Sequence, residues 1–262
     1  MLNQGYSGCM VEMEGKYIVK TSPPTYPKKR LRRQAEKQEL YKYLLKEKLY
    51  NIEIPIVFSI SDENDITKVK FQYFGGPTLT DGIINNLIYD YKYYFSKLLN
   101  YIDWEIDKSV EYNFKNEMDE KFKELYLKTG IDPIPFRLSK EDTYTGLAGY
   151  CHGDLCFDNV ICSNNKTVLI DFLDTYIDSP LQDIAKIRQD TYHYLTLYRK
   201  NSLNTDNIEK MKELDNIILD KYKHIIQTPL YKEIEQFTLW RIIPYCRNEE
   251  ERDYLINRIQ YV

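Results

Sequence analysis

The chain has 262 residues, of which 43% are hydrophobic and 29% are charged. This composition excludes a disordered protein, and the length suffices for one large domain or two lobes around a substantial core. The net charge of −4 argues against nucleic acid as the main partner, and no apolar run approaches the roughly 18 residues that a membrane span needs. The odd number of cysteines, five, argues against a disulfide framework, so we expect a reducing, cytoplasmic location.

The first 75 residues predict a small antiparallel sheet with one helix. Glu14-Gly15 favours a tight hairpin turn, and apolar residues at helical spacing predict a helix over 31–49. Gly75-Gly76-Pro77 breaks the alternating pattern and predicts a hinge. The expected strands cover residues 1–4, 9–13, 16–20, 54–60 and 68–74, the last two joined by a polar turn over 61–65.

The rest of the chain is predicted to be mostly helical. From Thr80 to about Leu127 the sequence mixes polar and apolar residues at helical spacing, and the segment after Pro180 has the same character. Two short strands, 160–162 and 167–171, are expected between them, around a turn that contains Asn164 and Asn165. We therefore predict an α+β protein with one lobe over residues 1–75 and a larger, mostly helical lobe over 76–262.

The segment from Cys151 to Phe172 carries the residues with the clearest chemistry. Asp154 is followed five residues later by Asn159, and Asp171 stands at the end of an apolar strand. Phosphoryl transfer needs one carboxylate that orients the attacking hydroxyl and accepts its proton, together with oxygen ligands for the Mg²⁺ on the nucleotide phosphates. The spacing of these three residues supplies such a set, and protein kinases use the same Asp-x-x-x-x-Asn pattern.

This segment resembles a known family. His152-Gly-Asp-x-x-x-x-Asn159 with Ile170-Asp-Phe172 is similar to the aminoglycoside phosphotransferase and choline kinase group, whose fold is bilobal and protein-kinase-like. The resemblance implies Asp154 as catalytic base, Asn159 and Asp171 as Mg²⁺ ligands, and His152 as a residue that organises the loop. Pro180-Leu-Gln-Asp183-Ile-Ala matches a further family element, which implies that Asp183 starts a helix and ties down the catalytic loop.

In the first lobe, the same fold places a glycine-bearing loop over the phosphates and a strand lysine against them. Lys20 ends an apolar strand and needs a partner for its charge, for which Glu36 or Glu39 of the following helix is expected. Backbone groups near Tyr73 and Phe74 would contact the nucleotide base at the hinge. The residues expected to bind nucleotide are Gly5, Ser7, Gly8, Lys20, Glu36, Tyr73 and Phe74.

The expected activity is transfer of the γ-phosphoryl group of ATP or GTP to a hydroxyl of a small molecule. The segment from Leu169 to Lys186 resembles phosphotransferases of bacterial surface-carbohydrate pathways, which suggests a sugar, an amino alcohol or a related building block as acceptor. An aminoglycoside-modifying enzyme and a non-catalytic nucleotide-binding module are the alternatives. The expected partners are a nucleoside triphosphate with Mg²⁺ and a small hydroxyl-bearing acceptor, with no nucleic acid.

Two further features allow two interpretations each, and a third predicts part of an acceptor pocket. The basic run Lys28–Arg33 forms either an anion-binding patch or a solvated helix start. Asp174 and Asp178 either serve a cationic acceptor or a second Mg²⁺, or are solvated loop acids. The tyrosines of 89–94 pave a helix and are expected to contribute to an acceptor pocket.

Overall fold

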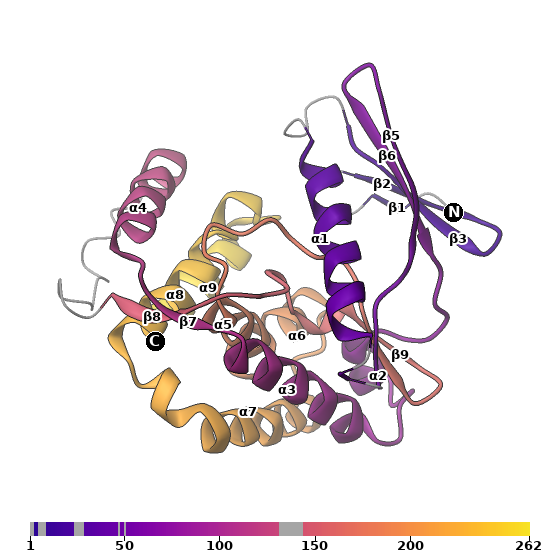
Figure 1. Ribbon diagram of the computed structural model, residues 1–262. Coiled ribbons are helices and arrows are strands. Elements are labelled where there is room, and N and C mark those ends of the chain that lie inside the picture. Colours follow the sequence, from indigo (N-terminus) through magenta and orange to yellow (C-terminus); the bar gives the residue numbers. More distant parts are fainter. Residues whose placement is uncertain (1–2, 5–8, 24–28, 47, 50, 131–143) are drawn as a thin grey trace.

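The computed structural model describes residues 3–4, 9–23, 29–46, 48–49, 51–130 and 144–262, and the structural statements below concern these residues. An antiparallel sheet occupies one end of the molecule and a larger, mostly helical part occupies the other, with α1 between them (Figure 1). This arrangement confirms the expected α+β fold.

The sheet is formed by five strands in the order β1-β2-β3-β6-β5. Gly15 adopts a left-handed backbone conformation, as the predicted hairpin turn requires. The second hairpin turns more tightly than expected, because Asn64 and Asp65 both tolerate positive φ and form a two-residue turn by themselves. The elements of this part are β1 (Asn3–Gln4), β2 (Met10–Glu14), β3 (Tyr17–Thr21), α1 (Arg30–Leu45), β5 (Val57–Glu63) and β6 (Ile66–Gln72).

A small apolar cluster joins α1 to the sheet. Leu31 and Ala35 of the helix pack against Val69 and Phe71 of β6. Lys20 of β3 pairs in register with Val69, and residues that pair across two strands project to the same face. Lys20 therefore lies on the face of the sheet that carries α1.

The second part contains eight α-helices among the described residues, as the sequence led us to expect. They are α2 (Leu79–Ile84), α3 (Tyr91–Asp107), α4 (Lys115–Thr129), α5 (Pro180–Thr191), α6 (Leu195–Arg199), α7 (Thr205–Ile226), α8 (Pro229–Trp240) and α9 (Glu249–Ile259). A two-stranded sheet of β7 (Val110–Asn113) and β8 (Thr145–Ala148) interrupts them. No pattern in the sequence indicated this sheet, because all four residues of β7 are exposed and its partner strand lies far along the chain.

A third sheet supports the segment with the catalytic motif. It combines β4 (Ile52–Glu53), β9 (Val160–Ser163) and β10 (Lys166–Leu169) in the order β4-β10-β9. Asn164 and Asn165 form the predicted turn with positive φ. β4 belongs to the first 75 residues by sequence but pairs with β10 in the second part. The division into two lobes at residue 75 stays a prediction.

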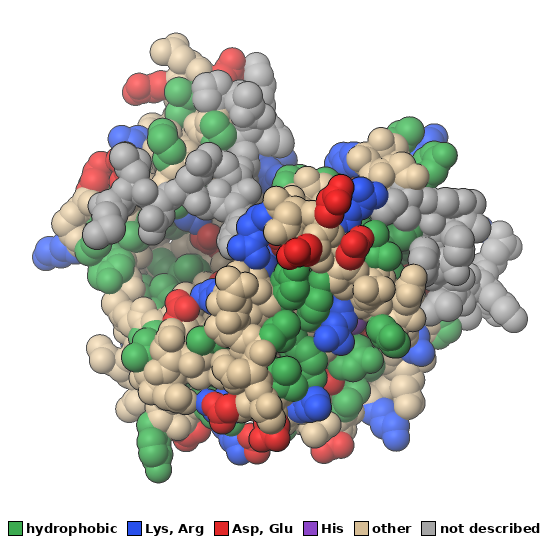
Figure 2. All heavy atoms as spheres, turned by 180° about the vertical axis from the view of Figure 1, so that it is seen from behind, with side chains coloured by type: hydrophobic (Ala, Val, Ile, Leu, Met, Phe, Trp, Pro, Cys, Tyr) green, Lys and Arg blue, Asp and Glu red, His purple; other side chains and the backbone are tan. Residues whose placement is uncertain are grey.

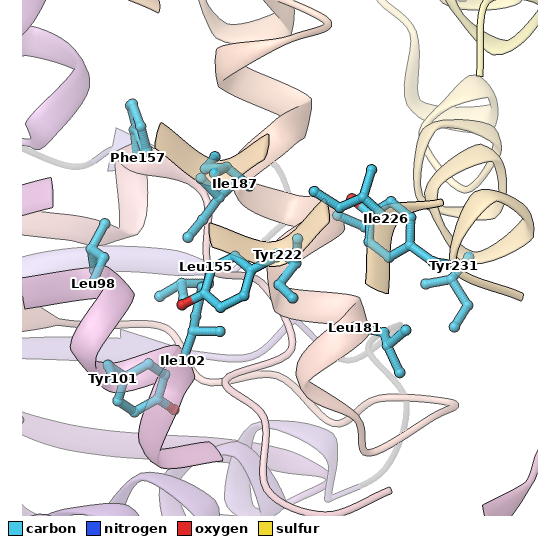
Figure 3. Packing of buried hydrophobic residues seen from close by; sticks show 14 of the residues in the cluster. Leu98, Tyr101, Ile102, Leu155, Phe157, Leu181, Ile187, Tyr222, Ile226 and Tyr231 are labelled. Carbon is cyan, nitrogen blue, oxygen red and sulfur yellow. The ribbon is translucent and has the colours of Figure 1, made fainter. Parts of the chain in front are cut away.

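The main core is centred on α5, all of whose residues are buried. Figure 3 shows how the side chains of the neighbouring elements meet there: Leu98 of α3, Leu155 of the catalytic loop, Ile187 of α5 and Tyr222 of α7. Because α5 touches so many elements, it is a rigid base on which the catalytic loop can be fixed.

The surface carries mixed charge. On the face shown in Figure 2, acidic and basic side chains are interspersed and do not form one broad basic region. None of the helices in the described ranges is long and apolar enough to cross a lipid bilayer.

Candidate active site

The loop over residues 151–159, the predicted catalytic loop, is held by two carboxylates of α5. The helix begins after Ser179, whose side chain accepts a hydrogen bond from the Leu181 backbone, with Pro180 in the first turn. One turn later Asp183 accepts hydrogen bonds from the backbone N–H groups of His152 and Gly153, the latter at 2.8 Å. This is the anchoring role expected for Asp183. Burial raises the pKa of Asp183 to about 6, although both backbone donors favour its charged form.

A second anchor holds the other end of the loop and was missed by the sequence analysis. Asp190 accepts the backbone N–H of Phe157 at 2.7 Å and the hydroxyl of Thr196. Asp190 follows Asp183 by seven residues, which is two helical turns, so both carboxylates project from one face of α5. That spacing is the signal that could have identified it.

Gly153 is required by the close approach of two chain segments. Its φ is +89°, and a Cβ added there would lie 2.7 Å from the Leu173 carbonyl oxygen and would also clash with Thr175. Only glycine fits between them without displacing the backbone. The His-Gly-Asp motif thus packs directly against the segment that follows Asp171.

His152 orders the loop and does not titrate near neutral pH. It is fully buried, its Nε2 lies 2.8 Å from the Ile170 carbonyl oxygen, and its Nδ1 accepts the Asp154 backbone N–H at 3.2 Å. These partners assign the proton to Nε2, and burial lowers the pKa of His152 to about 4. A neutral imidazole with both nitrogens engaged positions Asp154 but is not available for proton transfer.

Asp154 lies between an amide and an ammonium group. Asn159 donates from Nδ2 to the Asp154 carbonyl oxygen at 2.8 Å and to Oδ2 at 3.1 Å. Lys186 of α5 lies 2.8 Å from Oδ1, and the Asp154 side chain is 28% exposed. Burial raises the pKa of Asp154, but the charge of Lys186 offsets this effect, so the pKa lies below its ordinary value. Asp154 is thus an accessible carboxylate that stays ionised.

Asp171 completes the cluster from the end of β10. The backbone N–H of Ile170 donates to the Asn159 carbonyl oxygen at 3.0 Å, which brings Asp171 beside the catalytic loop. Asp171 has φ +63°, an uncommon conformation for a residue with a side chain and one that is often found at functional sites. Lys20 from β3 forms an ion pair with its carboxylate. The ion pair between Lys20 and Asp171 therefore joins the five-stranded sheet to the segment that carries the motif.

The oxygen atoms of this cluster suit Mg²⁺. Asn159 donates through its amide nitrogen, and among the described residues no donor contacts its Oδ1. A carboxylate at Asp171 and an amide oxygen at Asn159 are hard ligands of the type that Mg²⁺ takes together with phosphate oxygens. No group of three or more His, Cys, Asp or Glu residues in the described ranges could hold a metal ion by itself.

The expected pairing of Lys20 with a helix glutamate is wrong. Lys20 pairs with Asp171, whereas Glu36 is exposed and lies 3.6 Å from Arg32 on its own helix. Leu31 and Ala35 face the sheet, and Glu36, one residue further on, projects to solvent. Glu39 is likewise exposed. The helix contributes to the site through other residues.

Those residues are Lys37 and Tyr41, which the sequence analysis missed. Lys37 donates to the Leu173 carbonyl oxygen at 2.8 Å and lies 3.3 Å from Asp178. The Tyr41 hydroxyl donates to the Cys151 carbonyl oxygen at 2.8 Å and accepts the backbone N–H of the same residue. α1 is thereby fixed to the first residue of the catalytic motif and to the segment after Asp171.

The same contacts account for the basic run and for the two loop acids. Arg33 lies 2.5 Å from Asp174, and Arg32 lies 2.8 Å from Asp62 of β5. Asp174 and Asp178 are therefore each paired with a basic residue of α1. The pairing supports a role within the molecule for the described part of the basic run, in place of an anion-binding patch, although Asp174 and Asp178 both stay exposed to solvent.

The predicted hinge is anchored to β9. Gly76 has φ +140°, and a Cβ there would clash with the Cys162 carbonyl oxygen. The Cys162 backbone N–H donates to the Pro77 carbonyl oxygen at 2.9 Å. The Tyr73 backbone N–H donates to the Lys16 carbonyl oxygen, and Tyr73 is 43% exposed. Glycine at position 76 is thus explained by close contact with β9. Tyr73 and Phe74 stay predicted nucleotide contacts, and Gly5, Ser7 and Gly8 lie outside the described residues.

The tyrosines of 89–94 do not lie near Asp154. Tyr93 donates to the Asn165 carbonyl oxygen at 3.1 Å, and several of these residues line a cavity of about 480 Å³ together with Cys162. Asn165 is in the β9–β10 turn, whereas Asn159 and Asp171 stand at the opposite end of that hairpin. The expectation that this cluster contributes to an acceptor pocket beside the catalytic base is therefore wrong.

Comparison with known proteins agrees with this geometry. Residues 134–200 match the sequence model of the phosphotransferase enzyme family APH, which confirms the resemblance seen in the motifs. No curated protein sequence matches the chain significantly.

Solved structures extend the similarity to the whole fold. A thermostable mutant of the aminoglycoside phosphotransferase APH(4)-Ia in its apo form is similar with a TM-score of 0.64 and 11% identity, over 100% of this chain and 92% of that chain. The ternary complex of a related mutant with ADP and hygromycin B gives 0.64 and 12%, with the same coverage. Aminoglycoside phosphotransferase APH(3'')-Id from Streptomyces rimosus ATCC10970, bound to ADP and streptomycin, gives 0.54 and 13%, over 93% and 92%. At this identity the comparison establishes the kinase-like fold.

Proposed function

We propose that the protein is a small-molecule kinase that transfers the γ-phosphoryl group of ATP or GTP to a hydroxyl group. The observation that carries the proposal is the meeting of Lys20, Asp154, Asn159 and Asp171 at one place, from a sheet and a loop that are distant in sequence. The match of residues 134–200 to a phosphotransferase family and the kinase-like fold support it.

Each of these residues would have a separate role in the reaction. The acceptor oxygen attacks the γ-phosphorus, the bond from that phosphorus to the oxygen bridging to ADP breaks, and the hydroxyl proton passes to Asp154. The ionised state of Asp154 suits a base, and Lys20 would position the phosphates. Asn159 and Asp171 would hold Mg²⁺, which neutralises phosphate charge when it is bound. His152 and Asp183 keep the loop in place.

The test uses Asp154→Asn, which keeps the shape of the side chain and removes its basicity. We expect ADP release with a hydroxyl acceptor to fall by about 10²- to 10⁴-fold. Binding of ATP or GTP, measured as a Mg²⁺-dependent thermal shift, should persist. Unchanged turnover in this variant, or wild-type protein that binds neither nucleotide with Mg²⁺, would overturn the proposal. Nucleotide binding without ADP release across sugars, amino alcohols and aminoglycosides would indicate the non-catalytic module.

A further inference from the structure

One face of α5 contacts the loop over residues 151–159 at three places. Asp183 and Asp190 hold its two ends, and Lys186, which lies between them on the helix, reaches its middle. Spacings of three and four residues place these side chains on the same helix face. Nζ of Lys186 lies 2.8 Å from Oδ1 of Asp154, the proposed base. The residue that contacts the base is therefore an ammonium group on a flexible four-carbon stem, which has to be held in one conformation.

Helix geometry offers Lys186 a second carboxylate. Asp190 stands four residues further along α5, a spacing at which a lysine and a carboxylate of one helix commonly pair. The Asp190 carboxylate accepts the backbone N–H of Phe157 and the hydroxyl of Thr196 instead. In the described part of the chain, Lys186 forms an ion pair with Asp154 and none with Asp190. The helix spacing alone therefore does not explain why the ammonium group lies on Asp154.

Gln189 makes the contact that does explain it. Its Oε1 accepts a hydrogen bond from Nζ of Lys186 at 2.5 Å. An ammonium group has donors only, so the Gln189 amide presents its oxygen to Lys186 and not its nitrogen. Gln189 is 5% exposed and the Lys186 side chain is 10% exposed, so little water is available to replace this acceptor. Two of the three N–H donors of the ammonium group are thereby directed, one to Gln189 and one to Asp154.

The orientation of the Asp154 carboxylate depends on this ammonium group. Oδ1 is held by Lys186 at 2.8 Å, whereas Oδ2 receives the longer hydrogen bond, 3.1 Å, from the neutral amide of Asn159. If Lys186 turned to Asp190, Oδ1 would lose this contact and the carboxylate would be free to rotate about χ2, a torsion with broad minima. A general base acts only when its oxygen lies within reach of the hydroxyl, so such rotation would slow the reaction.

We propose that Gln189 is a positioning residue of the active site. It keeps the ammonium group of Lys186 on Asp154, away from the second carboxylate of the helix, and so fixes the Asp154 carboxylate in the orientation that receives the acceptor hydroxyl. This inference rests on the proposed kinase function, because it assigns a residue that acts on the proposed base. Loss of the Gln189 oxygen should lower kcat and leave KM for the nucleotide nearly unchanged, because Lys20 is held by Asp171 and not by α5.

The experiment uses Gln189→Met, which keeps the length of the side chain and removes its oxygen. ADP release from the Mg²⁺–ATP complex is measured with the best acceptor found among sugars, amino alcohols and aminoglycosides, or with water as the acceptor. We expect kcat to fall about tenfold, in line with the loss of a hydrogen bond to a charged group, and KM for ATP to change by less than about threefold. Gln182→Met is the matched control, because Gln182 is a buried glutamine of the same helix that contacts Thr238 of α8. Its kcat should stay within about twofold of the wild type.

A double-mutant cycle separates positioning through Lys186 from a general loss of stability. In the Lys186→Met background the ammonium group is absent, so adding Gln189→Met should lower kcat by less than about a further twofold. An unchanged kcat in Gln189→Met, an equal loss in Gln182→Met, or the full loss of about tenfold in the Lys186→Met background would overturn the inference.

A crystal structure of Gln189→Met decides the case in which the wild type releases no ADP. We expect Nζ of Lys186 to leave Oδ1 of Asp154 in this variant, and an ammonium group that still contacts Oδ1 overturns the inference. Nucleotide binding and Asp154→Asn are measured in parallel. A fall of ADP release in Asp154→Asn without a fall in Gln189→Met marks failure of this inference alone, whereas turnover that Asp154→Asn leaves unchanged marks failure of the kinase function.

Discussion

The catalytic loop and the five-stranded sheet are stabilised in different ways. The loop is fixed by buried carboxylates of α5: Asp183 accepts two backbone N–H groups at one end, and Asp190 accepts one at the other. The sheet depends on a small apolar cluster under α1 and on partly exposed ion pairs such as Lys70–Glu14. The loop should therefore be sensitive to single polar substitutions, and the sheet should tolerate them. Three pairs of substitutions test this contrast.

The largest effect is expected for Asp183→Ala. This change leaves the N–H groups of His152 and Gly153 without a partner in a buried place, at a net cost of about 2–4 kcal/mol. Asp62→Ala in β5 removes an exposed carboxylate that is paired with Arg32 and Thr67, and should lower the unfolding free energy much less. Urea unfolding measures both. Equal losses of unfolding free energy in the two variants would show that the two regions are stabilised alike.

A change of intermediate size is expected in the pH dependence of turnover. With Lys186 present the pKa of Asp154 lies below its ordinary value. Lys186→Met removes the charge that contributes most to lowering it, while burial still disfavours the ionised form, so the pKa rises. Because the base must be ionised, the acid limb of the kcat profile should move to higher pH, by about 1–3 units. Lys70→Met in the sheet is the matched control. If the acid limb of the kcat profile does not move in Lys186→Met, then Lys186 is not the residue that positions Asp154 and lowers its pKa.

The smallest effect concerns the connection between the two regions. Tyr41→Phe removes both hydrogen bonds to the Cys151 backbone and keeps the ring, at a cost of about 1–2 kcal/mol. Tyr43→Phe, at a side chain that is 79% exposed, should change the unfolding free energy by less than about 0.5 kcal/mol. Thermal unfolding of the two variants side by side measures the difference, and indistinguishable stabilities would mean that the Tyr41 hydroxyl does not hold α1 in place.

The sequence allowed the meeting of Asp154, Asn159 and Asp171 to be predicted, because phosphoryl-transfer chemistry demands particular residues at fixed spacing, and their catalytic roles stay predictions. Asp154, Asn159 and Asp171 are recognisable without knowledge of their surroundings, and hairpin turns such as Glu14-Gly15 are set by local backbone preferences. Asp183 could be assigned because it lies in a motif of its own.

What could not be predicted depends on contacts between distant segments. The partner of Lys20 is 151 residues away, and nothing in the helix sequence reveals that Glu36 faces solvent while Lys37 reaches Leu173. The position of the 89–94 tyrosines is set by packing against the β9–β10 turn, which a local pattern does not specify. Such placements follow from the tertiary arrangement, which local patterns in one sequence leave open.

The pairing of β4 with β10 has a consequence for how the two parts can be exchanged between related proteins. A recombination point after residue 75 would replace, along with the sheet and α1, the strand over Ile52 and Glu53 that borders the catalytic hairpin. A donor sequence therefore has to match this edge as well as the contacts of the sheet and α1. The first 75 residues can therefore be exchanged as a unit only if the two paired positions between β4 and β10 are kept.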